Sequence, residues 1–225
     1  KEAGDAPANS GHLFTRMPSS YTGVRFENRL TDTREMNVFT YRNFYNGGGV
    51  AIGDINNDGL PDVFMTSNMG ANKLYLNKGN FTFEDISKKA GIEQLGRWNT
   101  GVVMADINAD GWLDIYVCNA GYNKFRNKQA NAMFINNHNM GFTDKAKEMG
   151  LDESGYTTHA AFFDYDLDGD LDMFLLNHSV HQNGTFKPRK EFIGTYNSLS
   201  GDRFYRNDGN KFADVTRETG INSSA

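Results

Sequence analysis

Oxygen-bearing side chains recur with one fixed spacing in three short segments of this sequence. Each segment follows the pattern Asp-x-Asx-x-Asp-Gly-x-x-Asp, and the first copy begins at Asp54. Calcium prefers six to eight oxygen ligands in a flexible cage of carboxylates and carbonyls. Alternate side chains of a tight turn point toward one centre, and the glycine at the sixth position permits a bend that a β-carbon would hinder. The pattern therefore predicts three calcium-binding loops.

The predicted ligands stand at positions 1, 3, 5, 7 and 9 of each loop, with a main-chain carbonyl at position 7. They are Asp54, Asn56, Asp58, Leu60 and Asp62 in the first loop, Asp106, Asn108, Asp110, Trp112 and Asp114 in the second, and Asp164, Asp166, Asp168, Asp170 and Asp172 in the third. The third loop has four carboxylates at its side-chain ligand positions, whereas the others have three carboxylates and one amide. Since negative charge attracts a cation, we expect the third loop to bind calcium most tightly.

Three other interpretations of the pattern fit less well. An EF-hand begins with the same residues, but it needs a glutamate at position 12 and a helix on each side. Position 12 here is Met65, Val117 or Leu175, and the flanking runs resemble strands. Magnesium seldom uses an all-protein cage. Turns without any cation would bring four or five carboxylates close together, where they would repel one another.

The segments that must position these loops also repeat. Each loop is followed by three strand-like runs, which in the first copy are residues 63–66, 73–76 and 81–86. The later copies place these runs at 115–118, 132–135 and 141–144, and at 173–176, 203–206 and 211–215. With the apolar run before the loop, each copy holds four short strands in about 50 residues, which is typical of a propeller blade. We therefore expect an all-β fold, a β-propeller of four-stranded blades, rather than a β-sandwich, which would not place the same loop at the same point of every unit.

The repeats predict the organisation of the chain. We expect a flexible N-terminal tether at residues 1–22, an outer, ring-closing strand with its lead-in at 23–46, and blades at 47–98, 99–155 and 156–225, the third with an insertion at 177–202. Propellers often use an N-terminal outer strand to complete their last blade. A closed ring needs at least about four blades, so we expect the three blades to be part of a longer propeller.

Composition excludes several classes of protein. The 225 residues carry a formal net charge of −5, which argues against a nucleic-acid-binding surface. The sequence has no run of 18 apolar residues, so we expect no transmembrane helix. Its one cysteine, Cys118, lies in an apolar run and is interpreted as a small core residue.

The repeated segments resemble the FG-GAP/VCBS repeats of the integrin alpha-chain propeller and of many secreted bacterial proteins. The resemblance covers roughly residues 47–221. The run 39–50 is similar to bacterial proteins related to cartilage acidic protein, which carry a C-terminal ASPIC/UnbV segment. The resemblance implies a seven-bladed ring in an exported protein, secreted or on a bacterial cell surface with a lipid anchor upstream. It also implies a binding, adhesion or scaffolding role.

The end of the blades opposite the calcium loops is the expected recognition surface. Because each calcium loop joins the first two strands of a blade, the loops that lead into each blade lie at the other end. Those loops contain Tyr45, Arg97, Trp98, Tyr156 and His159. Aromatic and arginine side chains are typical of protein or glycan recognition. The alternative is that these side chains pack between the blades.

Two hypotheses for function remain open. The first is a non-catalytic binding, adhesion or scaffolding module held rigid by calcium. The second is a carbohydrate-active enzyme, a lyase or hydrolase, in which calcium has a structural role. An enzyme needs a convergent acid/base pair or a nucleophile, and the sequence displays no such group clearly. His178 and His181 of the insertion would suit zinc or acid/base chemistry, but no third ligand accompanies them, so we expect a solvated loop and no enzyme.

Overall fold

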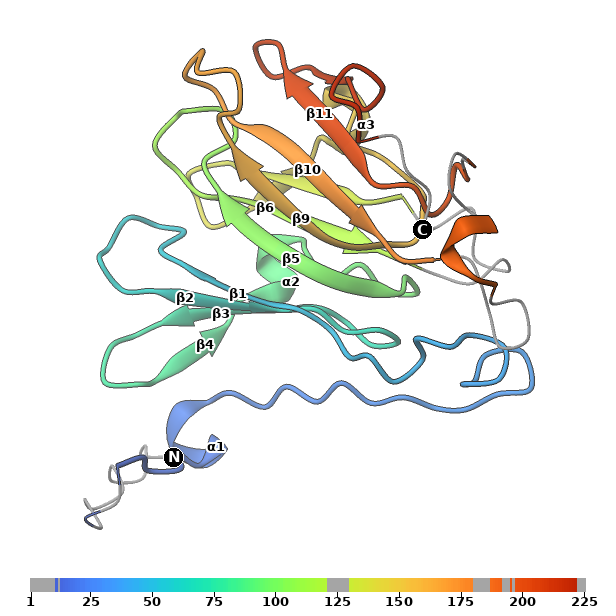
Figure 1. Ribbon diagram of the computed structural model, residues 1–225. Coiled ribbons are helices and arrows are strands. Elements are labelled where there is room, and N and C mark those ends of the chain that lie inside the picture. The colour runs from blue at the N-terminus through green and yellow to red at the C-terminus, as the bar shows by residue number, and fades with distance from the viewer. Residues whose placement is uncertain are drawn as a thin grey trace.

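Three four-stranded antiparallel sheets make up the architecture (Figure 1). The computed structural model describes residues 11, 13–120, 130–179, 187–191, 195 and 197–221. Within these residues, the first sheet contains β1 (Val50–Gly53), β2 (Asp62–Met65), β3 (Lys73–Asn77) and β4 (Phe83–Asp85). The second contains β5 (Asn99–Ala105), β6 (Asp114–Asn119), β7 (Ala132–Asn136) and β8 (Phe142–Asp144). The third contains β9 (Thr157–Phe163), β10 (Asp172–Asn177), β11 (Arg203–Asn207) and β12 (Phe212–Asp214). Neighbouring strands in each sheet are also neighbours in the chain.

A helical turn follows the last strand of the first and second sheets. These turns are α2 (Ser87–Ala90) and α3 (Ala146–Met149). Each ends at a glycine in the left-handed region, Gly91 at φ 77° and Gly150 at φ 80°, a conformation that glycine adopts without a Cβ clash. The sequence predicts strands in each repeat but no helical turn after them. The other described helical segments are α1 (Ser19–Thr22) and η2 (Arg189–Glu191), a 3-10 helix.

The middle sheet contributes to both layers of the core. All six residues of β6 are buried, and successive side chains of a strand point to opposite faces. Ile115 and Val117 pack in one cluster with side chains of the first sheet. Tyr116 and Cys118 pack in a second cluster with side chains of the third sheet. The core therefore consists of two apolar layers, one on each side of the middle sheet, and Cys118 is a core residue as expected.

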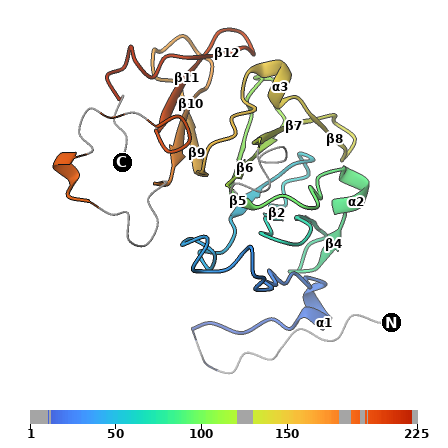
Figure 2. The ribbon, with the colours of Figure 1, turned by 90° about the vertical axis from the view of Figure 1, so that its right-hand side faces the viewer.

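The first strands of the three sheets lie side by side. β1 contacts β5, and β5 contacts β9, while Figure 2 shows β4, β8 and β12 at the periphery. Glycines permit this close approach, because a Cβ on Gly49 would lie 2.9 Å from the carbonyl oxygen of Thr100 and one on Gly101 would lie 2.3 Å from that of Thr158. The hydroxyl of Thr66 also donates to the carbonyl of Thr100 at 2.5 Å. The sheets thus meet at their first strands and spread apart toward their last ones.

The predicted fold class is confirmed as an all-β chain with repeated four-stranded sheets. The strands begin and end within a few residues of the predicted runs. Closure into a ring, the number of blades and the domain boundaries remain predictions.

The predicted tether and ring-closing strand remain predictions, and their described residues lie beside the first sheet. Residues 1–10 and 12 of the predicted tether 1–22 lie outside the described residues, but its end forms α1, where the Tyr21 hydroxyl donates to the carbonyl of Asn80 at 3.0 Å. The predicted outer strand at 23–28 pairs with no strand in the described part of the chain. This segment instead crosses the face of the first sheet that points away from the second (Figure 1). Its main chain contacts a side chain, since the Arg25 N–H donates to the Tyr75 hydroxyl at 3.2 Å.

The predicted insertion 177–202 is described only in part. Residues 180–186, 192–194 and 196, and with them His181, lie outside the described residues. Among the helices that the structure describes, none is long and apolar enough to cross a bilayer.

Candidate functional site

The three predicted calcium loops lie at one end of the sheets (Figure 1). Each joins the first strand of a sheet to the second, at residues 54–61, 106–113 and 164–171. The first two loops touch, because the Asn57 side chain donates to the carbonyl of Gly111 at 3.0 Å. The structure therefore gathers equivalent ligand positions from different parts of the sequence at one end of the molecule.

The first aspartate of each loop holds the turn together. Asp54 accepts hydrogen bonds from the N–H groups of Asp58 at 3.1 Å and Gly59 at 2.7 Å. Asp106 accepts the equivalent bonds from Asp110 at 3.0 Å and Gly111 at 2.8 Å. In the third loop, Asp164 accepts from Leu167 at 2.7 Å and from Gly169 at 3.1 Å. The same side chain thus organises all three turns, but the third turn bonds one residue earlier.

The aspartate at position 9 ties each loop to the third strand of its sheet. Asp62, Asp114 and Asp172 are fully buried. In the second loop, Asp114 accepts from the N–H of Ile107 at 3.1 Å with one oxygen and from that of Asn136 at 2.8 Å with the other. Corresponding pairs of bonds reach Asp62 and Asp172. These carboxylates would stabilise the sheets even before any cation is considered.

Burial affects the acidity of these carboxylates. It raises the pKa of Asp114 to about 6, although the hydrogen bonds from Asn136 and Ile107 oppose the shift. Burial also raises the pKa of Asp62, again against two main-chain hydrogen bonds. A nearby cation would favour the ionised form of both groups.

The third loop has the highest density of carboxylates. One oxygen from each of Asp164, Asp166 and Asp172 lies within 4.8 Å of the other two. Partial desolvation and the neighbouring carboxylates of Asp168, Asp172 and Asp164 raise the pKa of Asp166. The Oδ1 atom of Asp170 is buried without a hydrogen-bond partner in the described structure. An all-oxygen, negatively charged donor set of this kind fits a hard divalent cation.

The first two loops compensate part of their charge internally. The Asn56 amide donates to Asp58 Oδ2 at 2.9 Å, and the Asn108 amide donates to Asp110 Oδ2 at 2.8 Å. Rotation of the amide would turn its oxygen toward a cation instead. The residues at positions 1, 3, 5 and 9 of these loops therefore also fit a cation, with one carboxylate fewer than in the third loop.

A histidine next to the second loop was not anticipated from the sequence. His138 Nε2 lies 3.0 Å from Asp110 Oδ2, and its ring stacks on Trp112 with centroids 4.7 Å apart. Burial opposes the shift, but the hydrogen bond from His138 lowers the pKa of Asp110. His138 has φ 60°, in the turn where the other two sheets carry Gly79 and Gly209, also at positive φ. A histidine where the other two repeats have glycine was the sequence signal that could have identified His138.

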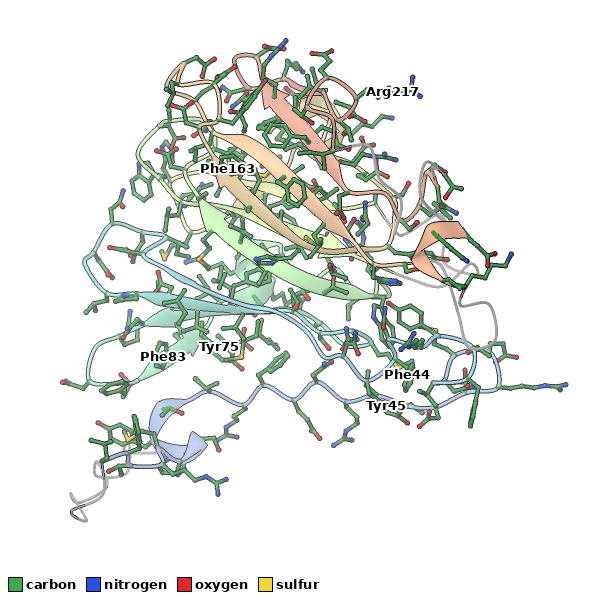
Figure 3. The ribbon with its side chains drawn as sticks, in the orientation of Figure 1. Phe44, Tyr45, Tyr75, Phe83, Phe163 and Arg217 are labelled. Carbon is green, nitrogen blue, oxygen red and sulfur yellow. The ribbon has the colours of Figure 1, made fainter. Side chains whose placement is uncertain are left out.

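The opposite end of the sheets contains a cavity of about 280 Å³. Of the five residues predicted to bind a ligand, Trp98 and His159 line it. Tyr45 instead donates to Asp32 at 3.1 Å, and Arg97 donates to the carbonyl of Ala130 at 2.7 Å. Figure 3 shows Tyr45 and its neighbour Phe44 at this end of the molecule.

Two of the five residues predicted to bind a ligand are buried in packing contacts. Trp98 is buried in a cluster with Met36, Tyr41 and Phe44, and Tyr156 is buried and stacks on His178 with centroids 4.8 Å apart. The alternative of packing between elements therefore holds for Tyr156. Trp98 belongs to this cluster and also lines the cavity.

A hydrogen-bonded pair in the cavity wall was not anticipated. The Tyr41 hydroxyl lies 3.1 Å from His178 Nε2, and His178 Nδ1 lies 2.8 Å from the carbonyl of Ser179. A carbonyl can only accept, so Nδ1 carries the hydrogen and Tyr41 donates to Nε2. Burial lowers the pKa of His178 and raises that of Tyr41. Both groups are therefore neutral near pH 7.

Comparison with known families identifies the repeat. The family model of the FG-GAP-like repeat matches residues 33–117. Residues 33–117 carry the FG-GAP-like repeat. The match includes the first two predicted calcium loops, and the third sheet, which lies outside the match, has a loop at the same place between β9 and β10.

Curated relatives share short stretches with these FG-GAP-like repeats. Cartilage acidic protein 1 of Xenopus tropicalis is 42% identical over 74 residues, which are 32% of this chain and 11% of the relative. Integrin alpha-8 of Gallus gallus is 33% identical over 87 residues, covering 32% of this chain and 8% of the relative. The chain thus spans about a tenth of the length of these relatives.

One solved structure, of an Agrocybe aegerita lectin that recognises non-reducing terminal N-acetylglucosamine, aligns with 73% of this chain and 36% of the lectin. The identity is 18% and the TM-score is 0.36. A likeness at this level supports no conclusion about this chain.

Proposed function

We propose that the chain is a calcium-stabilised, non-catalytic part of an extracytoplasmic β-propeller that binds a protein or glycan partner. One observation carries the calcium proposal. The same loop occurs three times, and in each copy a buried aspartate, Asp62, Asp114 or Asp172, connects the cation position to the third strand. A cation held there would brace the first three strands of each sheet.

The donor set favours calcium over other metals. Every loop offers carboxylate and carbonyl oxygens, the first two loops add an amide oxygen, and none has a thiolate or imidazole at the predicted ligand positions. Calcium accepts such flexible cages of six to eight oxygens, whereas magnesium demands a smaller octahedral shell and retains its waters. Calcium would supply positive charge where carboxylates crowd together, most of all in the third loop.

Apolar side chains on the outer faces support a propeller with further blades. Ile52 is 67% exposed in the first sheet, and Phe163 is 42% exposed in the third. Propeller blades pack face to face around a central channel, and these side chains fit such packing. The side-by-side first strands would line the channel.

The binding role rests on the relatives and on the cavity. Stretches similar to cartilage acidic protein 1 and integrin alpha-8 support a place outside the cytoplasm and a protein or glycan partner. The cavity at the end opposite the cation loops gives that partner a site. The pair Tyr41 and His178 gives no support for an enzyme, because the Tyr41 side chain is only 1% exposed and so has little access to a substrate.

Thermal unfolding of metal-free protein with and without calcium tests the proposal. At a free concentration about 100 times the dissociation constant, each site adds roughly 2.7 kcal/mol of stability, so the melting temperature should rise and EDTA should reverse the rise. Changing Asp58, Asp110 and Asp168 together to Asn should abolish most of the shift. Asp208→Asn is the matched control, since this exposed carboxylate pairs with Arg206 outside the loops. An unchanged melting temperature in calcium would refute the structural role of the ion.

A further inference from the structure

We propose that the cavity opposite the cation loops binds one ring of a neutral sugar. This inference rests on the proposed binding role and names the ligand class. Four separate segments form the wall, at residues 41–49, 98–101, 158–159 and 178. Three of them lie at the starts of first strands or on the loops before them, so the cavity opens where the sheets meet.

The lining excludes recognition through charge. No Asp, Glu, Lys or Arg stands among the described residues that line the cavity, although charged residues make up 23% of the chain. A buried charge without a partner is costly. The ligand that fits is therefore uncharged.

Polar side chains with free hydrogen-bonding groups converge on the cavity. Asn43, Asn46 and His159 line it, and their side chains make no hydrogen bond to another described residue. A primary amide both donates and accepts, and so does a neutral imidazole. Sugar hydroxyls have the same dual capacity, which makes a polyhydroxylated ligand a good match.

The rest of the wall suits the less polar face of a sugar ring. Trp98 lines the cavity and is 7% exposed, so it contributes a small aromatic surface, and Gly47, Gly48 and Gly49 bring main chain to the surface of the cavity without side chains. A volume of about 280 Å³ lies just below the range of roughly 300–1,000 Å³ for drug-sized ligands. The cavity therefore fits one ring rather than an extended chain, whereas a peptide would require a longer groove or an open strand edge.

Binding of neutral monosaccharides to the full chain tests this inference. The probes are glucose, galactose, mannose and N-acetylglucosamine, measured by saturation-transfer NMR and calorimetry, with glucuronate and glucosamine as charged counterparts. At least one neutral sugar should bind saturably, and its charged counterpart should bind at least about tenfold more weakly. His159→Ala or Asn46→Ala should each weaken binding about tenfold, as expected for the loss of one hydrogen bond.

Tyr45→Ala is the matched control, because Tyr45 is exposed beside Asn46 but does not line the cavity. It should leave sugar binding unchanged. A folded protein that binds none of the neutral sugars, equal binding of the charged sugars, or equal losses in Tyr45→Ala and His159→Ala would each overturn the inference. The calcium melting shift, measured on the same sample, separates the two proposals. A shift without sugar binding overturns only the sugar site, and sugar binding without a shift overturns only the calcium role.

Discussion

The second and third cation loops have the same spacing but compensate their charge differently. In the second loop, Asn108 and His138 both donate to Asp110. In the third loop, Asp166 replaces the asparagine, and it lies close to Asp164 and Asp172 without an amide donor between them. Hydrogen-bond donors therefore satisfy part of the second loop, whereas we expect the third loop to need a cation more strongly.

The turn itself reflects this difference. Asp110 N–H donates to Asp106 in the second loop, but in the third loop the N–H of Leu167 donates to Asp164. Position 4 is left-handed in both loops, with φ 56° at Ala109 and φ 65° at Leu167, and this conformation is less favourable for the bulkier leucine. We infer that the sequence motif sets the predicted ligand positions, while the residue at position 3 sets how strongly each loop would need an ion.

The largest expected effect concerns the feature that both loops share. Asp114→Ala removes the acceptor of two main-chain N–H groups, those of Ile107 and Asn136. Leaving them unsatisfied should lower the free energy of unfolding by about 2–4 kcal/mol, measured by urea denaturation without calcium. Asp172→Ala should cost a similar amount. A loss below about 0.5 kcal/mol, the size expected for the exposed control Asp208→Ala, would show that the position 9 carboxylate does not brace the sheet.

Exchanging the residues at position 3 of the second and third loops should exchange their relative calcium affinities. Asp166→Asn removes one carboxylate from the third loop, and Asn108→Asp adds one to the second. We expect calcium affinity to fall about tenfold in the first variant and to rise about tenfold in the second, which corresponds to about 1.4 kcal/mol for each change in affinity. Calorimetric titration of both variants checks this. If calcium affinity changed in the same direction in both variants, the residue at position 3 would not explain the difference between the loops.

Acid should stabilise the metal-free protein through the second loop. Because burial raises the pKa of Asp114 from 3.8 to about 6, the folded state takes up this proton at a higher pH than the unfolded state does. The contribution to stability is complete below pH 3.8 and is lost as the pH rises through about 6. Between pH 7.5 and 5, urea denaturation should show that the native chain gains stability relative to Asp114→Asn. Parallel curves for the two proteins would contradict the shifted pKa.

The smallest expected effect concerns His138. His138→Gly relieves a left-handed conformation that costs roughly 1–3 kcal/mol but removes the bond to Asp110 and the stack on Trp112. These changes oppose one another, so the free energy of unfolding should change by less than about 1 kcal/mol. Calcium affinity of the second loop should rise two- to threefold, or by about 0.5 kcal/mol, because Asp110 Oδ2 loses a competing donor. A loss of stability above about 2 kcal/mol would instead give His138 a structural role.

Much of the fold follows from the sequence because local geometry dictates it. The strand runs around each loop are short and rich in apolar residues, and the loop has aspartates and glycine at fixed positions, so both are visible in a single repeat. The helical turns α2 and α3 were not predicted, because four residues are too few to display a helical period. Residues 23–28 pair with no strand in the described structure, although Gly23 lies against the main chain of Phe83.

The parts of the site that the sequence did not predict depend on contacts between distant residues. His138 and Asp110 are 28 residues apart, and Tyr41 and His178 are 137 apart. Their proximity follows from the packing of whole sheets, which no local pattern encodes. The sequence also did not determine whether Arg97 and Trp98 are exposed, because such a side chain in a loop can pack against its neighbours or contact a ligand.

Calorimetric titration of calcium into metal-free protein tests whether the third loop is the tightest of three calcium sites. The native chain is compared with the double variant Asp166→Asn, Asp168→Asn. We predict that the native chain shows one site tighter than the rest and that the double variant loses this site while it keeps the weaker ones. A tightest site that is unchanged in the double variant, or the absence of any calcium binding by the native chain, would contradict the account.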